Sequence, residues 1–256
     1  MNLGFNAKAC KPRAAFVIVA LRGTSDYSDA KPAPGYSLFQ SGLEYPAGLS
    51  PNQGTPMKLL GANASPYALK VIIVLEEKGL PYEYVVIRPT APEVSAANPL
   101  SKIPTLIRDD GRALYDSAVI VEYLDGIAPT PKLIPEQFED RIEVKRWDAL
   151  ADGIIDAAVA IMHENRLDET KRKGADWYAR QQQKIDASLA TMERDLGAFA
   201  FCTGDSITLA DVTSGAALSY VERVLPSLVW RGTHPGLAGL AERLLARPAF
   251  KKALAP

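Results

Sequence analysis

The sequence predicts a two-domain protein of the α+β/all-α type, with a mixed domain over residues 57–130 and an all-helical domain over residues 136–256. Three observations support this division. Strand and helix patterns alternate in the first region. Pro residues interrupt the chain over residues 130–135, and apolar residues recur at helical spacing beyond residue 135. Residues 1–56 show no sustained periodicity and are expected to be a disordered leader or extension.

A strand, a helix and a second strand open the mixed domain. The first strand is predicted over Met57–Gly61 and is broken by an Asn-Ala-Ser-Pro segment. Ser65 suits the N-cap of a helix over residues 66–78, because its hydroxyl can accept a backbone N–H, and Pro suits the first helical position. Aromatic and β-branched residues at 82–87 predict the second strand. Together these elements form a βαβ unit.

Two further strands and a helix complete the domain. Pro104 can begin a strand but cannot occupy the middle of one, so the third strand is predicted over residues 104–108. An Asp-Gly hairpin signal leads into a return strand over residues 112–115. Asp116-Ser117 then caps a helix, with Ser117 expected at the N-cap. The order β-α-β, linker, β-β-α is that of the thioredoxin-like fold.

Helical periodicity dominates the second half of the chain. Long helices are predicted over residues 136–165 and 176–196. Thr208 and Asp211 then stand at capping-box spacing, which indicates a folding element rather than a site. Cys202 is expected to be a small buried residue.

The first 56 residues differ from the rest in composition. The apolar run at 14–21 follows basic residues and faintly resembles a signal peptide, but Arg22 comes directly after it and no small-x-small cleavage site is present beyond it. We favour a dispensable extension or a translation start at Met57. The alternative interpretation is a targeting segment.

Composition narrows the classes of function. The formal net charge is −1, so no electrostatic drive toward nucleic acid or an anionic membrane is visible, and neither partner is expected. The two cysteines, Cys10 and Cys202, form no metal or redox spacing, which favours a reducing, cytoplasmic setting. The two histidines, His163 and His234, suggest no metal site by their spacing.

Four short motifs occur in order along the mixed domain and the start of its last helix. They are Ser65-Pro66-Tyr67, Glu76-Glu77-Lys78-Gly79, Asn98-Pro99 with Lys102-Ile103-Pro104, and Asp116-Ser117. Together they resemble the soluble, cytosolic glutathione S-transferase family. The similarity is greatest to bacterial members with a Ser-Pro-Phe/Tyr turn and to the tau-like serine classes. The resemblance implies a cytoplasmic homodimer with glutathione as co-substrate, no metal and a role in detoxification.

The resemblance makes Ser65 the catalytic residue and a glutathione contact. A free thiol has a pKa near 8.5, so only a few per cent is thiolate at pH 7. A hydroxyl donor at a helix N-terminus can stabilise the thiolate by a charge-assisted hydrogen bond, aided by the helix dipole. The alternative is that Ser65 serves only as an N-cap.

The other motif residues would hold the remaining parts of glutathione. The resemblance gives Ile103 a backbone contact with the cysteinyl part, makes Pro104 a cis proline and directs Lys102 to the glycyl carboxylate. Asp116 and Ser117 would bind the γ-glutamyl end, by counter-charge and by free helix N–H groups. The alternatives are a strand-entry proline, a solvated lysine and ordinary helix capping.

A second-substrate pocket is expected beside the serine. Its candidate residues are Tyr67, in the first motif, and Asp156, Val159 and His163, which share one face of the long helix by their spacing. Packing or solvent exposure is the alternative role for His163.

The predicted function is a glutathione transferase that activates the thiol for attack on a hydrophobic electrophile, by conjugation or peroxide reduction. Reductive dehalogenation and isomerisation are further reactions open to such a site. The alternative class is a non-catalytic protein of this fold that binds partners or acts in a stress response. A thioredoxin-type disulfide exchanger is disfavoured, because no cysteine lies at the first turn.

Overall fold

The computed structural model describes residues 57–255. The predictions made for residues 1–56, including the disordered leader, the signal-like run and Cys10, lie outside the described residues. Elements follow one another in the order β1 (Met57–Gly61), α1 (Pro66–Glu77), β2 (Tyr82–Val86), α2 (Pro92–Ala97), β3 (Thr105–Ile107), β4 (Ala113–Leu114), α3 (Ser117–Ile127), α4 (Phe138–Asn165), the 3-10 helix η1 (Glu169–Lys171), α5 (Ala175–Leu196), α6 (Leu209–Val224), α7 (Pro235–Leu245) and α8 (Pro248–Ala253).

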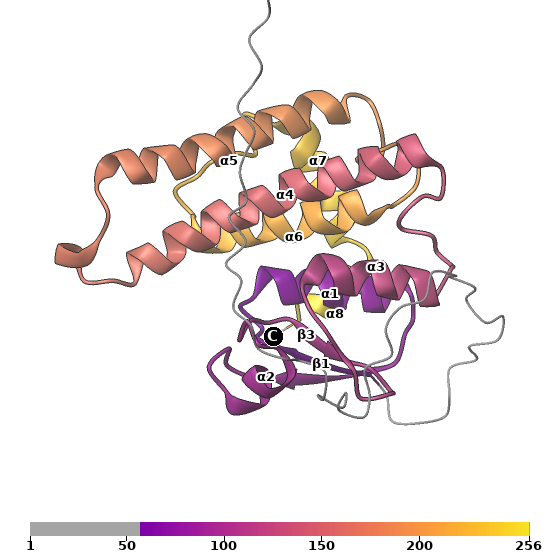
Figure 1. Ribbon diagram of the computed structural model, residues 1–256. Coiled ribbons are helices and arrows are strands. Elements are labelled where there is room, and N and C mark those ends of the chain that lie inside the picture. The colour runs from indigo at the N-terminus through magenta and orange to yellow at the C-terminus, as the bar shows by residue number, and fades with distance from the viewer. Residues whose placement is uncertain (1–56, 256) are drawn as a thin grey trace, which may run out of the picture. The chain divides into compact units, whose positions relative to one another are not determined.

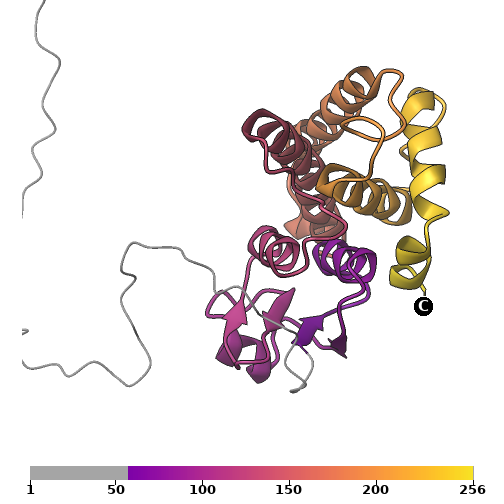
Figure 2. The same cartoon turned by 90° about the vertical axis from the view of Figure 1, so that its right-hand side faces the viewer.

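The four strands form one mixed sheet in the order β2-β1-β3-β4. β1 and β2 are parallel, whereas β3 is antiparallel to both β1 and β4. The helices α1 and α3 lie side by side between this sheet and the helical domain (Figures 1 and 2). The predicted thioredoxin-like N-terminal domain and all-helical C-terminal domain are thereby confirmed.

The linker predicted between the second and third strands contains a short helix, α2. Pro92 occupies its first turn, and Val94 is its buried residue. A single buried apolar side chain leaves no periodic pattern to detect, which explains why the sequence did not predict this helix. β3 is also shorter than expected and begins at Thr105, because Pro104 has no N–H to donate to a neighbouring strand.

Buried apolar side chains form one cluster that extends through both domains. It includes Ile73 of α1, Trp147 and Ile154 of α4, and Tyr220 of α6. Each fully buried side chain of this size contributes roughly 1.5–3 kcal/mol from removal of apolar surface from water. α1 is therefore packed between the sheet and the helical domain.

The segment between the two domains is anchored by a buried ion pair. The Lys78 ammonium lies 2.6 Å from Asp125 and donates to the backbone oxygens of Ala128 and Pro131, each at 2.6 Å. Asp125 in turn accepts from the N–H of Leu133 at 2.9 Å. The lysine of the Glu-Glu-Lys-Gly motif thus organises the connection from α3 toward α4.

The capping interaction predicted at the start of α6 is confirmed. The Asp211 carboxylate accepts the backbone N–H of Thr208 at 2.8 Å and that of Cys202 at 2.7 Å. Cys202 is buried, as expected, and burial raises the pKa of its thiol. Across residues 57–255, no helix is both long enough and apolar enough to span a membrane.

Candidate active site

The sheet register brings the predicted glutathione-binding motifs to one end of the N-terminal domain. Leu60, at the end of β1, pairs with Thr105, at the start of β3, so the turn before α1 lies beside the segment that precedes β3. Leu114, at the end of β4, pairs with Leu106. The three segments that carry Ser65, Ile103-Pro104 and Asp116-Ser117 therefore meet at the same edge of the sheet, although they are distant in sequence.

Ser65 is the N-cap of α1, as predicted. Its backbone N–H donates to the Ala62 oxygen at 2.8 Å, which closes a tight turn, and its Oγ accepts the N–H of Ala68 at 3.2 Å. Pro66 occupies the first turn of the helix. The Ser65 side chain is partly exposed, and its hydroxyl donates no hydrogen bond to another residue in the described part of the chain. Its proton remains available for a ligand.

The Ile103-Pro104 peptide bond is cis, as the sequence motif predicted. Asn98, which is fully buried, holds this segment by donating from Nδ2 to the Lys102 oxygen at 3.0 Å and to Thr105 Oγ1 at 3.2 Å. Pro104 is buried and Ile103 is partly exposed, so the peptide before the proline borders solvent at the sheet edge. Lys102 is exposed and forms no ion pair within residues 57–255.

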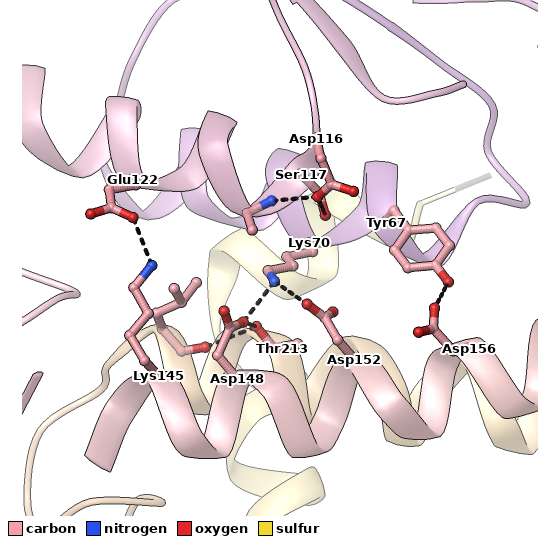
Figure 3. Close-up of polar contacts among 12 residues, drawn as sticks. Tyr67, Lys70, Asp116, Ser117, Glu122, Lys145, Asp148, Asp152, Asp156 and Thr213 are labelled. Carbon is pink, nitrogen blue, oxygen red and sulfur yellow. Dashed lines mark hydrogen bonds and ion pairs between the residues drawn. The ribbon is translucent and has the colours of Figure 1, made fainter. Parts of the chain in front are cut away.

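The prediction that Ser117 is the N-cap of α3 is wrong, because Asp116 occupies that position. The Asp116 Oδ1 accepts the N–H of Ala118 at 2.9 Å and the Ser117 hydroxyl at 3.2 Å (Figure 3). Asp116 is exposed and Ser117 is buried. The second carboxylate oxygen of Asp116 has no bond to the described residues, so it can accept from a cationic ligand.

The predicted second-substrate residues are only partly brought together. Tyr67, on the first turn of α1, donates its hydroxyl to Asp156 on α4 (Figure 3). Burial and this hydrogen bond raise the pKa of Tyr67 well above its usual range, so the phenol stays neutral. Val159 is partly buried and His163 is exposed in the last turn of α4. No hydrogen bond joins these two to Tyr67 within the described residues.

A buried charge cluster beside Tyr67 was not predicted. Lys70, one turn further along α1, is fully buried and lies 2.6 Å from Asp148 and 2.9 Å from Asp152 (Figure 3). Asp148 also accepts the hydroxyl of Thr213 on α6 at 2.6 Å. The cluster therefore ties the helix that presents Ser65 to two helices of the other domain.

One partner of Lys70, Asp152, has an unusual pKa. Burial raises the pKa of Asp152 to about 6, although the charge of Lys70 opposes the shift. The Oδ1 atom of Asp152 is buried without a hydrogen-bond partner, which explains the dominant cost of desolvation. A sequence signal for the cluster did exist: Asp148, Asp152 and Asp156 recur at four-residue spacing on α4, and a lysine interrupts the apolar residues of α1.

Residues 57–255 hold no group of three or more His, Cys, Asp or Glu side chains placed to bind a metal ion. The polar groups at the sheet edge are instead a hydroxyl, backbone groups and carboxylates. They can donate and accept hydrogen bonds, and Lys102 and Asp116 add one charge of each sign.

Comparisons with known proteins agree with this fold. Residues 64–127 match the family model of the glutathione S-transferase N-terminal domain, and residues 175–243 match that of the C-terminal domain. A crystal structure of a glutathione S-transferase from Methylobacillus flagellatus with glutathione bound is 41% identical, with a TM-score of 0.75 over 78% of this chain and 100% of that chain.

Two further proteins support the same assignment. A glutathione S-transferase from Methylobacterium radiotolerans, in complex with glutathione sulfonate, is 40% identical, with a TM-score of 0.74 over 78% of this chain and 95% of that chain. The uncharacterized GST-like protein YibF of Escherichia coli is 32% identical over 204 residues, which are 78% of this chain and 99% of YibF. On the joint evidence of the fold, the site and these matches, the chain belongs to the glutathione S-transferase family.

Proposed function

We propose that this protein is a glutathione transferase in which the Ser65 hydroxyl activates the glutathione thiol. The observation that carries the proposal is the state of Ser65, a partly exposed N-cap hydroxyl whose proton is donated to no described residue. Ser65 lies at the edge of the sheet where the Ile103-Pro104 and Asp116-Ser117 segments also converge. Family membership supports it, as do the glutathione sulfonate and the glutathione bound in two similar structures.

The energetics are within reach of this arrangement. Lowering a thiol pKa by about two units requires roughly 2.7 kcal/mol of preference for the thiolate. A hydrogen bond to a charged group contributes about 1.5–3 kcal/mol, and a helix N-terminus adds about 0.3–1 kcal/mol. The first turn of α1 carries no acidic residue that would oppose the anion. One hydroxyl at this helix end can therefore supply most of the required stabilisation.

Tyr67 has a second hydroxyl close to the site, and its contacts disfavour it as the activating group. Its proton is already donated to Asp156, and its raised pKa keeps the ring neutral. A tyrosine in this state would have to break the bond to Asp156 before it could donate to a thiolate. We therefore assign activation to Ser65 and place Tyr67 in the wall of the second-substrate pocket, with Asp156, Val159 and His163.

Glutathione binding is proposed to use the residues at the sheet edge. The backbone of Ile103, before the cis Pro104, would pair with the cysteinyl part. Lys102 would reach the glycyl carboxylate, since it is exposed and has no carboxylate partner within residues 57–255. Asp116 would attract the γ-glutamyl ammonium through its second carboxylate oxygen. Ser117, whose hydroxyl is donated to Asp116, would bind the γ-glutamyl carboxylate through backbone N–H groups at the start of α3.

The second substrate is proposed to be a hydrophobic electrophile, attacked by the thiolate in a conjugation or a peroxide reduction. We also propose a homodimer that works in the cytoplasm in detoxification. The resemblance of the motifs to the family supports both proposals. The two reactions are separated by assaying the full-length protein with an aryl halide and with an organic hydroperoxide.

The decisive experiment compares wild type with Ser65→Ala in glutathione titration calorimetry and in ultraviolet absorbance of the bound thiolate against pH. We expect both proteins to bind glutathione and only the wild type to lower its thiol pKa. If the wild type shows no binding at millimolar glutathione, the catalytic proposal is wrong, and the non-catalytic partner-binding function becomes the better account.

A further inference from the structure

The turn that presents Ser65 has little support of its own. It runs from Ala62 to Ser65 and is closed by one backbone hydrogen bond of 2.8 Å between these two residues. Asn63 and Ala64, its central residues, are exposed. The conformation of this turn sets the direction of the Ser65 hydroxyl, so whatever holds the turn also positions the activating group.

One side chain from the helical domain holds this turn. Arg223, in the last turn of α6, donates from Nη2 to the Ala64 oxygen at 2.8 Å and from Nη1 to the Asn63 oxygen at 3.4 Å. The Arg223 guanidinium carbon also lies 5.3 Å from the centre of the Tyr220 ring, so the side chain is oriented before it reaches the turn.

The same contact brings a positive charge close to Ser65. The Ala64 carbonyl carbon is bonded to the Ser65 nitrogen, so standard bond lengths place Nη2 within about 5 Å of that nitrogen. Arginine remains charged at every relevant pH, and its planar fork suits two neighbouring carbonyl oxygens. Arg223 is exposed, so solvent weakens its field, but a cation this close to the Ser65 nitrogen still favours an anion bound at the N-terminus of α1.

We infer that Arg223 is a positioning residue for Ser65: it fixes the Asn63–Ala64 turn from the helical domain and adds a positive charge that favours the glutathione thiolate. This inference rests on the proposed function. It makes thiol activation depend on both domains, because α6 supplies the arginine and α1 supplies the serine.

A matched control is available nearby. Arg231 is also stacked on an aromatic ring, with its guanidinium carbon 4.9 Å from the centre of Trp230, and it is paired with Glu222. It has no hydrogen bond to the Ser65 turn among the described residues. Arg231→Gln therefore removes a stacked arginine from the same region without touching the turn.

The experiment measures the thiol pKa of bound glutathione, its Kd and kcat/KM against pH in the full-length wild type, Arg223→Gln, Arg223→Lys and Arg231→Gln. We expect Arg223→Gln to raise the thiol pKa by about 0.5–1 unit. We also expect its kcat/KM near pH 6.5 to fall by about three- to tenfold, and this deficit to close at alkaline pH, where the thiol ionises unaided. Arg223→Lys keeps the charge and should recover most of the shift, while Arg231→Gln should match wild type.

The outcomes separate the inference from the proposal on which it rests. If the wild type lowers the thiol pKa and Arg223→Gln lowers it equally, the role of Arg223 is wrong and that of Ser65 stands. An equal rise in Arg231→Gln also overturns the inference, since the effect would then be general to this surface. If the wild type itself does not lower the thiol pKa, both the inference and the proposed function are wrong.

Discussion

The N-termini of α1 and α6 begin with the same kind of side chain but differ in its burial and in where its hydroxyl proton is donated. Ser65 starts α1 and receives one hydrogen bond of 3.2 Å at a partly exposed position. Thr208 starts α6 and is buried, and its N–H and hydroxyl donate to Asp211 at 2.8 Å and 3.0 Å. The first hydroxyl has a free proton, whereas the second has none.

The difference shows how one local signal can serve two purposes. A capping hydroxyl contributes typically about 1 kcal/mol to stability wherever it occurs. At the α6 cap the N–H and the hydroxyl of Thr208 are both donated to Asp211, so this cap stabilises the fold and has no proton left for a ligand. At α1 the cap is left incomplete at the edge of the sheet, where a ligand can complete it.

The largest effect that would test this comparison is expected at α6. Asp211→Ala leaves the backbone N–H groups of Cys202 and Thr208 without acceptors in the core and removes the acceptor of the Thr208 hydroxyl. We expect a loss of about 3–5 kcal/mol in the free energy of unfolding, measured by urea denaturation. A loss below about 1 kcal/mol would show that the α6 cap is not a folding element.

The next effect concerns pH and the cluster that joins α1 to α4. Burial raises the pKa of Asp152 to about 6 in the folded protein, above the usual value of 3.8. The folded state therefore binds the proton more tightly than the unfolded state between these values, so this group lowers stability as pH rises from about 4 to 6. Above about pH 6 its contribution stays constant at its least favourable level.

Asp152→Asn removes this titration. We expect the difference in unfolding free energy between variant and wild type to shift by about 2 kcal/mol in favour of the variant between about pH 4.5 and pH 7.5. Denaturant melts at these two pH values measure the shift. A difference that does not change with pH would contradict the raised pKa. Asp156→Asn, on the next turn of α4, also removes one carboxylate and is the control: it should not reproduce this pH-dependent shift.

At α1 the expected loss is in activity rather than stability. Ser65→Ala removes one partly buried capping bond, so we expect the free energy of unfolding to fall by at most about 1 kcal/mol. The same change should lower kcat/KM by about 10- to 100-fold through loss of a hydrogen bond to the thiolate. Thr208→Ala is the mirror control and should reduce stability while leaving kcat/KM of the folded fraction unchanged. Equal losses of activity in both variants would remove the distinction between the two caps.

The smallest effect is expected at a solvent-accessible ion pair between the thioredoxin-like domain and the helical domain. Lys145 of α4 lies 2.9 Å from Glu122 of α3, and both side chains are accessible to solvent (Figure 3). Lys145→Ala should change the unfolding free energy by no more than about 0.5 kcal/mol, because solvent screens such a pair. A loss above about 2 kcal/mol in a denaturation experiment would mean that surface charges hold the domains together, contrary to the role given to the buried core.

Much of this protein was determined by the sequence itself. The strand and helix order, the Ser65 cap and the Asp211 cap all depend on short-range chemistry: turn residues, capping side chains and periodic burial. Such features leave local patterns because neighbouring residues alone decide them. The cis Ile103-Pro104 bond was implied by the resemblance of its motif to a family, not by local preference. The helix α2 left no such pattern, since Val94 is its single buried residue.

The tertiary structure alone decided how distant residues meet. The spaced carboxylates of α4 and the lysine of α1 are visible in the sequence, but their pairing is not: only the structure shows that Lys70 is buried between Asp148 and Asp152. The sequence also could not show that Arg223 holds the turn before Ser65 across 159 positions of chain. These contacts depend on how the helices pack, because sliding one helix past another by about one turn would give each of its side chains different partners. Local preference carries no information on that scale, so only the packed molecule decides which charges are paired and which hydroxyl remains free.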